Sequence, residues 1–142
     1  MQVGIGKRCD HCEVQAALVA FFPEGPVCVY ASIEAFAEYG PEGSINGILA
    51  GNPSEFPTLL DVLPDPPEPR AIYREQLRLA CFLSERLSCR TICDGSEHGD
   101  SSAPYWSIVW VGGVAWLADD CGSVFADGEG GPVRLVRRLE IT

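Results

Sequence analysis

Residues 105–120 read Y-W-S-I-V-W-V-G-G-V-A-W-L-A-D-D and limit the folds open to this chain more than any other segment. Gly112 and Gly113 predict a tight turn between two strands, because paired glycines adopt the positive φ angles of short hairpin turns at little cost. Because side chains alternate along a strand, both faces of this hairpin are apolar. One face carries Trp106, Ile108, Trp110, Ala115 and Leu117, and the other carries Tyr105, Val109, Val111, Val114 and Trp116. Such a hairpin either lies inside a sheet covered on both sides or keeps one face for a partner.

Arg70 to Leu87 has the clearest helical periodicity in the chain. Its apolar stripe comprises Ile72, Leu79, Leu83 and Leu87, with Gln76 and Ala80 beside them. This spacing predicts a helix over 70–87 that packs one face on the core. Arg70, Arg74 and Arg78 form a second stripe, in which neighbouring like charges cost an isolated helix about 0.2–0.5 kcal/mol per pair. We therefore expect acidic segments of the same protein to face these arginines, with a phosphate or a partner as the alternative.

Shorter segments are predicted from turn and cap residues. Two apolar runs, Glu13 to Phe22 and Pro26 to Ala31, flank the turn P-E-G and suggest a hairpin. Val14 to Phe22 is also consistent with a buried helix, because periodicity does not separate the two in so short a run. Ser32 is expected to cap a short helix from Ile33 to Tyr39.

Residues 41–69 contain seven of the eleven prolines, so we expect a long connection there, with at most a short helix from Ser54 to Leu63. Strands are expected at Cys89 to Cys93 and at Val133 to Ile141. A chain of 142 residues has the size of one domain. We therefore predict a single domain over residues 1–142 of the α+β class, in which an antiparallel sheet carries one main helix and a tryptophan-rich C-terminal hairpin.

Charge is distributed in blocks along the sequence. Residues 9–69 contain ten of the twenty acidic residues and no lysine or arginine, whereas residues 70–90 contain five arginines. The net charge of the whole chain is −10. Such a field repels nucleic-acid phosphates and attracts basic protein surfaces, so the sequence argues against direct binding of DNA or RNA and for a basic protein partner. Solubility is the simpler explanation of the same acids.

The N-terminal residues M-Q-V-G-I-G-K-R lack the apolar core of a secretion signal, and no run approaches the ~18 apolar residues of a membrane span. We therefore expect a cytoplasmic protein that binds no membrane. The seven cysteines are an odd number, which favours free thiols over a framework of disulfides.

Cys9 and Cys12 have the spacing of half a tetrahedral zinc site. The other close pair, Cys89 and Cys93, lies ~13 Å apart if it is on a strand, which is too far to share one ion. Cys93 with His98 across the following turn, or His11 itself, is a candidate to complete a zinc site. A redox dithiol would instead need a helix that begins at this motif, because the helix dipole lowers the pKa of the first thiol. We expect no cofactor and keep zinc at Cys9 and Cys12 as the alternative.

No catalytic motif is present in the sequence. His11 and His98 are the only histidines, and neither accompanies a nucleophile motif such as G-x-S-x-G. Clustered carboxylates at Asp119 and Asp120 and around Asp94 are weak signals, because turns and strand ends commonly collect acids. The stretch G-E-G-G-P at 128–132 lacks the lysine of a phosphate-binding loop. We therefore expect the protein not to be an enzyme.

The segment from Arg70 to Asp120 consists of the helix Y-R-E-Q-L-R-L-A-C-F-L-S-E-R-L, the stretch C-R-T-I-C, an acidic turn and the tryptophan-rich hairpin. In size, charge and order of elements it resembles the small acidic immunity proteins that protect bacteria from their own polymorphic or contact-dependent toxins. The resemblance implies a non-enzymatic cytoplasmic inhibitor that binds its cognate toxin. A toxin that acts on nucleic acid presents a basic cleft, which the acids of residues 9–69 would fill.

We expect the partner-binding residues to be carboxylates of the acidic loops around one aromatic anchor, since buried aromatic residues supply many of the hot spots of interfaces. They are Glu34, Glu38, Glu42, Glu55, Asp61, Asp65, Trp116, Asp119 and Asp120. Two other functions are consistent with the sequence. One is a phage or regulatory inhibitor that mimics nucleic acid and binds a host DNA- or RNA-binding protein, and the other is a small zinc-binding module built on Cys9 and Cys12.

Overall fold

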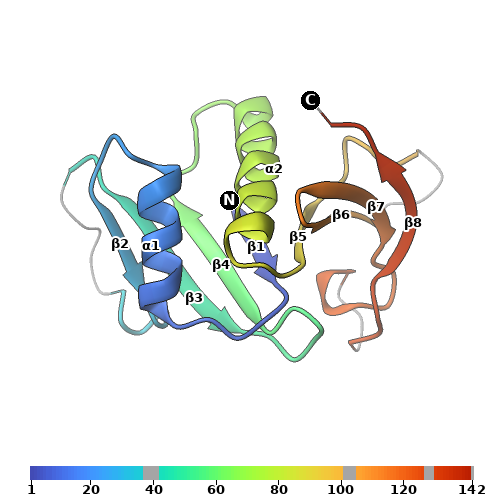
Figure 1. Ribbon diagram of the computed structural model, residues 1–142, viewed down its shortest axis with the longest axis horizontal. Helices are drawn as coiled ribbons and strands as arrows, with labels where there is room; N and C mark the ends of the chain where they lie inside the picture. Colours follow the sequence, from blue (N-terminus) through green and yellow to red (C-terminus); the bar gives the residue numbers. More distant parts are fainter. Residues whose placement is uncertain (37–41, 101–104, 127–129, 142) are drawn as a thin grey trace.

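Both helices of the protein pack on the same face of one mostly antiparallel sheet (Figure 1). A computed structural model describes residues 1–36, 42–100, 105–126 and 130–141. In chain order the described elements are β1 (Gln2–Ile5), α1 (His11–Phe21), β2 (Val27–Tyr30), β3 (Ile45–Gly51), β4 (Thr58–Leu63), α2 (Pro69–Arg86), β5 (Thr91–Asp94), β6 (Trp106–Val111), β7 (Val114–Asp119), a 3₁₀ turn η1 (Val124–Ala126) and β8 (Arg134–Leu139). The strands lie in the order β2-β3-β4-β1-β5-β6-β7-β8, and only β2 and β3 run parallel to each other. The predicted α+β class is confirmed.

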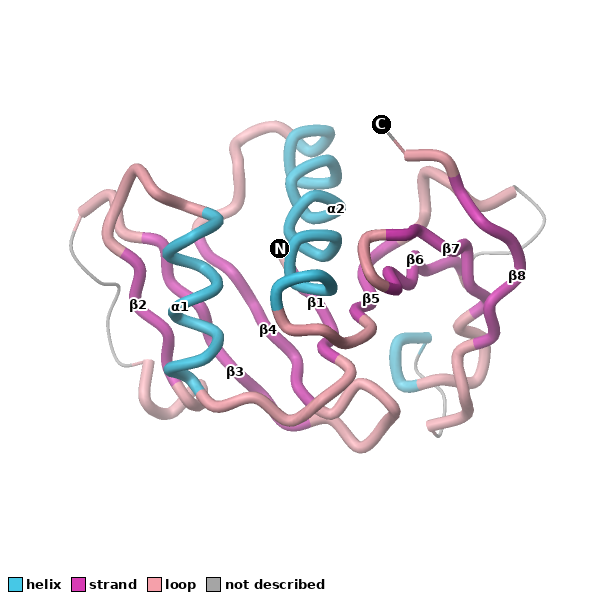
Figure 2. The backbone as a smooth tube through the Cα atoms, in the orientation of Figure 1, coloured by secondary structure: helices cyan, strands magenta, loops and turns pink. Residues whose placement is uncertain are grey.

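The main core lies between the helices and the sheet. Val14 and Leu18 of α1 and Leu83 of α2 are fully buried against a sheet face that carries Val3 and Ile5 of β1. Figure 2 shows the two helices on the near side of the strands in this view. Burial of one such leucine stabilises the fold by about 1.5–3 kcal/mol, so this layer holds the two helices in place.

The segment from Glu13 to Phe21 is helical, and the hairpin predicted for residues 13–31 is wrong. The Asp10 side chain caps α1 by accepting a hydrogen bond from the backbone N–H of Glu13 at 2.9 Å, which satisfies a donor that the first helical turn leaves free. The helix ends at Phe21, just before Pro23. The following strand β2 pairs with β3 in parallel, and the segment before it is the helix α1 and not a strand.

Residues 41–69, predicted to be a connection, contain β3 and β4, and the short helix suggested for Ser54 to Leu63 is replaced by β4. Among the described prolines of this segment, Pro53 and Pro57 are in the turn between the two strands, and Pro64 follows β4. The described part of the helix predicted for Ile33 to Tyr39, residues 33–36, forms a turn, and residues 37–39 lie outside the described residues.

The predicted helix over 70–87 is confirmed as α2, and the predicted hairpin is confirmed as β6 and β7. Gly112 and Gly113 have φ angles of 55° and 80°, as the turn requires. The register pairs Trp110 with Ala115 and Val109 with Trp116, so the two predicted faces are the observed ones. The final strand is confirmed as β8, and an irregularity in its pairing with β7 places Arg138 opposite Trp116.

A second, smaller core covers part of the sheet face that the helices leave free. It consists of Phe56, Ile92, Val109, Ala118 and Val133, with Phe125 of η1 packed against it. The hairpin is therefore covered on both faces near its base. At its tip Val111 is 40% exposed, so this part of the outer face lies open to solvent.

The sheet has a weak point between β1 and β5. Only two residue pairs join these strands, Gly4 with Ile92 and Ile5 with Thr91, whereas β1 makes four pairs with β4. We call this junction the seam, defined by β1 and β5. Helix α2 packs over the seam, where the Thr91 hydroxyl donates a hydrogen bond to the backbone carbonyl of Ala80 at 2.7 Å. The seam therefore joins a half-sheet of β2, β3, β4 and β1 to a half-sheet of β5 to β8.

Candidate functional site

The described residues between 9 and 63 form one end of the molecule, which we call the acidic end: α1, β2, β3, β4 and the described parts of their connections (Figure 1). Residues 9–69 of the sequence contain ten acidic residues and no lysine or arginine. The loops that hold Glu24 and Glu42 lie side by side, because the backbone N–H of Ile45 donates to the carbonyl of Pro26 at 2.8 Å. Glu24 and Glu42, which are far apart within the charge block of the sequence, are thus carried by neighbouring loops.

Glu34 and Asp10 lie beyond the other end of β2. Asp10 and Ala31, which follows β2, line the same shallow depression, and Glu34 is three residues further along the chain. The side chains of Glu24, Glu34 and Glu42 are exposed, and within the described residues none of them forms an ion pair. Carboxylates therefore flank β2 at both of its ends.

The outer edge of β2 is closed by a side chain of α1. The Gln15 amide donates to the carbonyl of Val27 at 3.2 Å and accepts from the N–H of Val29 at 3.3 Å. In this way it takes the hydrogen bonds that a neighbouring strand would otherwise make. Edge strands with free backbone groups invite pairing with another chain, and Gln15 reduces that tendency here.

Four of the predicted partner-binding carboxylates form contacts within the fold. Asp65 forms an ion pair with the N-terminal ammonium group, and Asp61 accepts from the Gln2 side chain at 3.3 Å. Glu55 accepts from the backbone N–H of Val133 at 2.9 Å and lies 3.7 Å from Arg90. Asp119 accepts from the N–H of Cys121 at 2.9 Å and pairs with Arg134 at 3.2 Å. Glu38 lies outside the described residues.

The structure does not bring the predicted anchor Trp116 to the acidic end. Trp116 is on β7, near one edge of the sheet, whereas Glu34 and Glu42 flank β2 at the opposite edge. Its half-buried side chain lies beside Val109 and Arg138 on the neighbouring strands. The predicted residues thus form two separate groups.

A pocket of about 440 Å³ opens at the seam, where β1 and β5 separate. Because the ladder between β1 and β5 stops after two pairs, the backbone N–H of Gln2 has no partner on β5; it donates to the side-chain oxygen of Gln76 on α2 at 3.0 Å. The residues that line this seam pocket are Gln2, Gly4, Gln76, Ile92, Cys93, Asp94, Tyr105, Trp106, Ser107, Asp120 and Phe125. Its volume is within the ~300–1,000 Å³ typical of sites for small molecules or side chains.

Asp120 is the most unusual residue of the seam pocket. Its side chain is 6% exposed, and one carboxylate oxygen, Oδ2, accepts a short hydrogen bond from the Ser107 hydroxyl. The other oxygen, Oδ1, is buried and has no hydrogen-bond partner in the described part of the chain. Burial raises the pKa of Asp120 above 3.8, the Ser107 hydrogen bond lowers it, and the negative charges of Asp119 and Asp94 raise it further. A carboxylate so placed favours a ligand that brings a positive charge and a hydrogen-bond donor.

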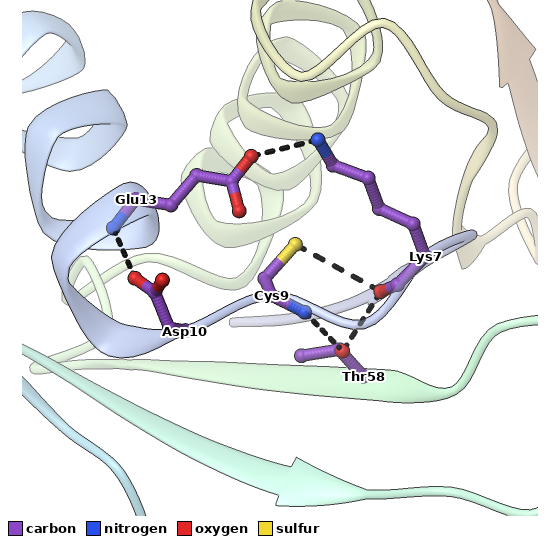
Figure 3. A network of polar contacts seen from close by, with 5 residues as sticks. All are labelled: Lys7, Cys9, Asp10, Glu13 and Thr58. Carbon is purple, nitrogen blue, oxygen red and sulfur yellow. Dashed lines mark hydrogen bonds and ion pairs between the residues drawn. The ribbon is translucent and has the colours of Figure 1, made fainter.

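The polar groups around Cys9 attach the start of α1 to β4 (Figure 3). The Cys9 N–H donates to the Thr58 hydroxyl at 3.2 Å, and that hydroxyl donates to the Lys7 carbonyl at 2.8 Å. The Lys7 ammonium group pairs with Glu13 at 2.7 Å. Burial, followed by the charge of Glu13, raises the pKa of the Cys9 thiol to about 11. The motif therefore begins a helix, but the first thiol is not activated as a redox dithiol requires.

Cys12 is exposed on the first turn of α1, with its sulfur 3.6 Å from the His11 ring. In the described part of the chain, no group of three or more histidine, cysteine or acidic side chains is arranged to hold a metal ion. The structure therefore adds no further ligand to the predicted zinc pair of Cys9 and Cys12.

We expected an acidic segment to face the arginine stripe of α2, but among the described residues no ion pair joins the stripe to such a segment. Arg78 pairs at 2.7 Å with Glu75 of the same helix and lies over the ring of Phe21. Among the described residues, neither Arg70 nor Arg74 forms an ion pair. This helix therefore presents a basic strip next to the acidic end.

We compared the chain with protein-family models, curated proteins and solved structures, and it matches none of them. The described helices include none with the length and apolar character that a membrane crossing needs. Fold and site geometry are therefore the basis for a functional proposal.

Proposed function

We propose that this protein is a non-enzymatic inhibitor that binds and neutralises a basic protein, namely a bacterial toxin with a basic active-site cleft, and that it acts as an immunity protein in the cytoplasm. The observation that carries the proposal is the acidic end: it lies within residues 9–69, which hold ten acids and no base, and its exposed Glu24, Glu34 and Glu42 form no ion pair among the described residues. A surface of one sign speeds up association with a partner of opposite charge and selects against other partners.

The geometry at β2 supports binding through side chains. Glu24 and Glu42 lie at one end of this strand and Glu34 at the other, all of them exposed. Gln15 occupies the strand edge, so a partner would not dock there by adding a strand. We infer that the partner lays its basic cleft across the end of the sheet and that the carboxylates occupy the place of the toxin's anionic substrate.

Co-expression with the product of the adjacent gene tests the proposal. We expect this chain to rescue growth of cells that express that product and to co-purify with it. The variant Glu34→Gln/Glu42→Gln should weaken both effects. The matched control, Glu85→Gln/Glu97→Gln, removes the same two charges from exposed positions outside the acidic end and should behave like the wild type.

If the two proteins form no complex and growth is not rescued, the immunity function is refuted. Equal loss in the test and control variants would show that net charge matters and the position of the acidic end does not. Capture of a non-toxic host protein that binds DNA or RNA would instead support the nucleic-acid mimic.

A further inference from the structure

The seam pocket has a polar wall built around Ser107. On β5, Asp94 is the cross-strand neighbour of Ser107, and the Ser107 hydroxyl donates to Asp120 beyond β7. Both carboxylates therefore lie next to the same serine. Within the described residues, no lysine, arginine or histidine lines the pocket, so its charge is negative.

Asp120 has an unused acceptor within this wall. Oδ2 is bonded to Ser107, whereas the buried Oδ1 has no partner among the described residues. A buried acceptor without a partner is costly, and a donor supplied by a ligand would remove this cost. Asp94 has both oxygens engaged in its own turn, with the N–H of Ser96 at 3.0 Å and the hydroxyl of Ser96 at 2.8 Å. Asp120 is therefore the residue that a ligand would engage first.

The remaining walls suit a flat cationic group. Trp106 and Tyr105 line the pocket at its outer end, and the Trp106 ring is fixed by a hydrogen bond from its N–H to the carbonyl of Asp100 at 3.1 Å. Aromatic rings attract cations that lie over their faces, and guanidinium groups stack on them especially well.

We propose that the seam pocket receives the guanidinium group of an arginine side chain that belongs to the basic partner, with the Asp120 carboxylate as its acceptor and Asp94 as a second carboxylate. The assignment of this arginine to a partner protein rests on the proposed function. A guanidinium group offers five donors in one plane and can reach two carboxylates at once, whereas an ammonium group is a compact point charge. The pocket also adds one specific contact to the proposed mode of binding. This contact is on the half-sheet away from the acidic end.

A blocked arginine tests the pocket without the partner. N-acetyl-arginine methylamide is titrated into the full chain, and the amide NMR signals of Ser107, Asp120 and Gly4 are followed. We expect saturable shifts at these residues, and none with the matching citrulline compound, which has the same shape but no charge. Asp120→Asn should weaken binding by about tenfold, because it removes the charge from the hydrogen bond. Glu42→Gln removes one charge at the acidic end and should leave binding of the compound unchanged.

Two results of the titration would overturn the inference: equal binding of the arginine and citrulline compounds, or equal binding to the wild type and Asp120→Asn. Circular dichroism and the NMR spectrum of Asp120→Asn show whether the variant is folded. If it is not, Ser107→Ala replaces it, with a smaller loss of affinity expected.

The source of the arginine is tested with the captured partner. Asp120→Asn should reduce the affinity of the complex by about tenfold. Unchanged affinity for the partner, together with binding of the blocked arginine, would mean that the pocket takes a free guanidinium compound, which contradicts the inference. Failure to capture any partner counts against the proposed function, whereas the titration still decides whether the pocket binds guanidinium.

Discussion

Replacing Ser107 with alanine removes the hydroxyl that donates to Asp120. Both residues are buried, with exposed fractions of 4% for Ser107 and 6% for Asp120. A hydrogen bond to a charged group contributes about 1.5–3 kcal/mol. We expect Ser107→Ala to lower the free energy of unfolding by about 2 kcal/mol at pH 7, measured by urea denaturation with an unchanged m-value.

Asp120→Asn is the matched variant, because it keeps an acceptor oxygen for Ser107 and removes the charge. Burial raises the pKa of Asp120, so the native state holds its proton more tightly than the unfolded state does. The contribution of Asp120 to stability is therefore greatest below pH 3.8 and is lost as the pH rises through the raised native-state pKa. We expect Asp120→Asn to be at least as stable as the wild type at pH 7. The variant should lack the pH-dependent contribution of Asp120 to the free energy of unfolding.

The two variants together form a double-mutant cycle. In the Asp120→Asn background, Ser107→Ala removes a neutral hydrogen bond and should cost only about 1 kcal/mol. In the wild-type background its cost should shrink as the pH falls towards 3.8, because protonation removes the charge. A cost that does not change with pH, or that is the same in both backgrounds, would refute the view that Ser107 stabilises a buried charged carboxylate.

Two further predictions concern the seam and the cysteines. Gly4→Ala should lower the free energy of unfolding by about 1–3 kcal/mol, because a Cβ atom there would lie 2.5 Å from Cγ2 of Ile92. Gly51→Ala is its control, since nothing lies within 4 Å of the added atom; equal urea midpoints for the two variants would contradict the packing described for the seam. At pH 8 iodoacetamide should modify exposed Cys12 much faster than Cys9, whose pKa of about 11 leaves roughly one thiol in a thousand ionised. Peptide mass spectrometry measures both rates, and similar rates would show that the Cys9 thiol is not protected.

The elements predicted correctly are those whose signal lies within the element itself. The leucines of α2 repeat at helical spacing, and Gly112 and Gly113 mark the hairpin turn. In α1 the run around Val14 is apolar on several sides, so its period does not separate helix from strand. The strands β3 and β4 are not predicted because prolines are frequent in residues 41–69, although Pro53, Pro57 and Pro64 lie outside both strands.

The candidate site was only partly predictable, because its main features depend on residues far apart in the sequence. Asp120 was selected as a carboxylate, but its burial depends on Ser107 and on the turn that carries Phe125. The seam pocket depends on how many residues of β1 pair with β5, which no local pattern encodes. Gln15 carries no sequence signal of its role either, since a glutamine on a helix is ordinarily a solvent-exposed residue.

Binding of a basic partner by the acidic end is tested most directly by the rate of association between this chain and the captured product of the adjacent gene, measured by stopped flow at low and high salt. The account predicts that Glu34→Gln/Glu42→Gln slows association by about threefold or more at low salt and flattens the salt dependence, while Glu85→Gln/Glu97→Gln has a smaller effect on both. A rate that barely changes with salt, or equal slowing by the two variants, would contradict it.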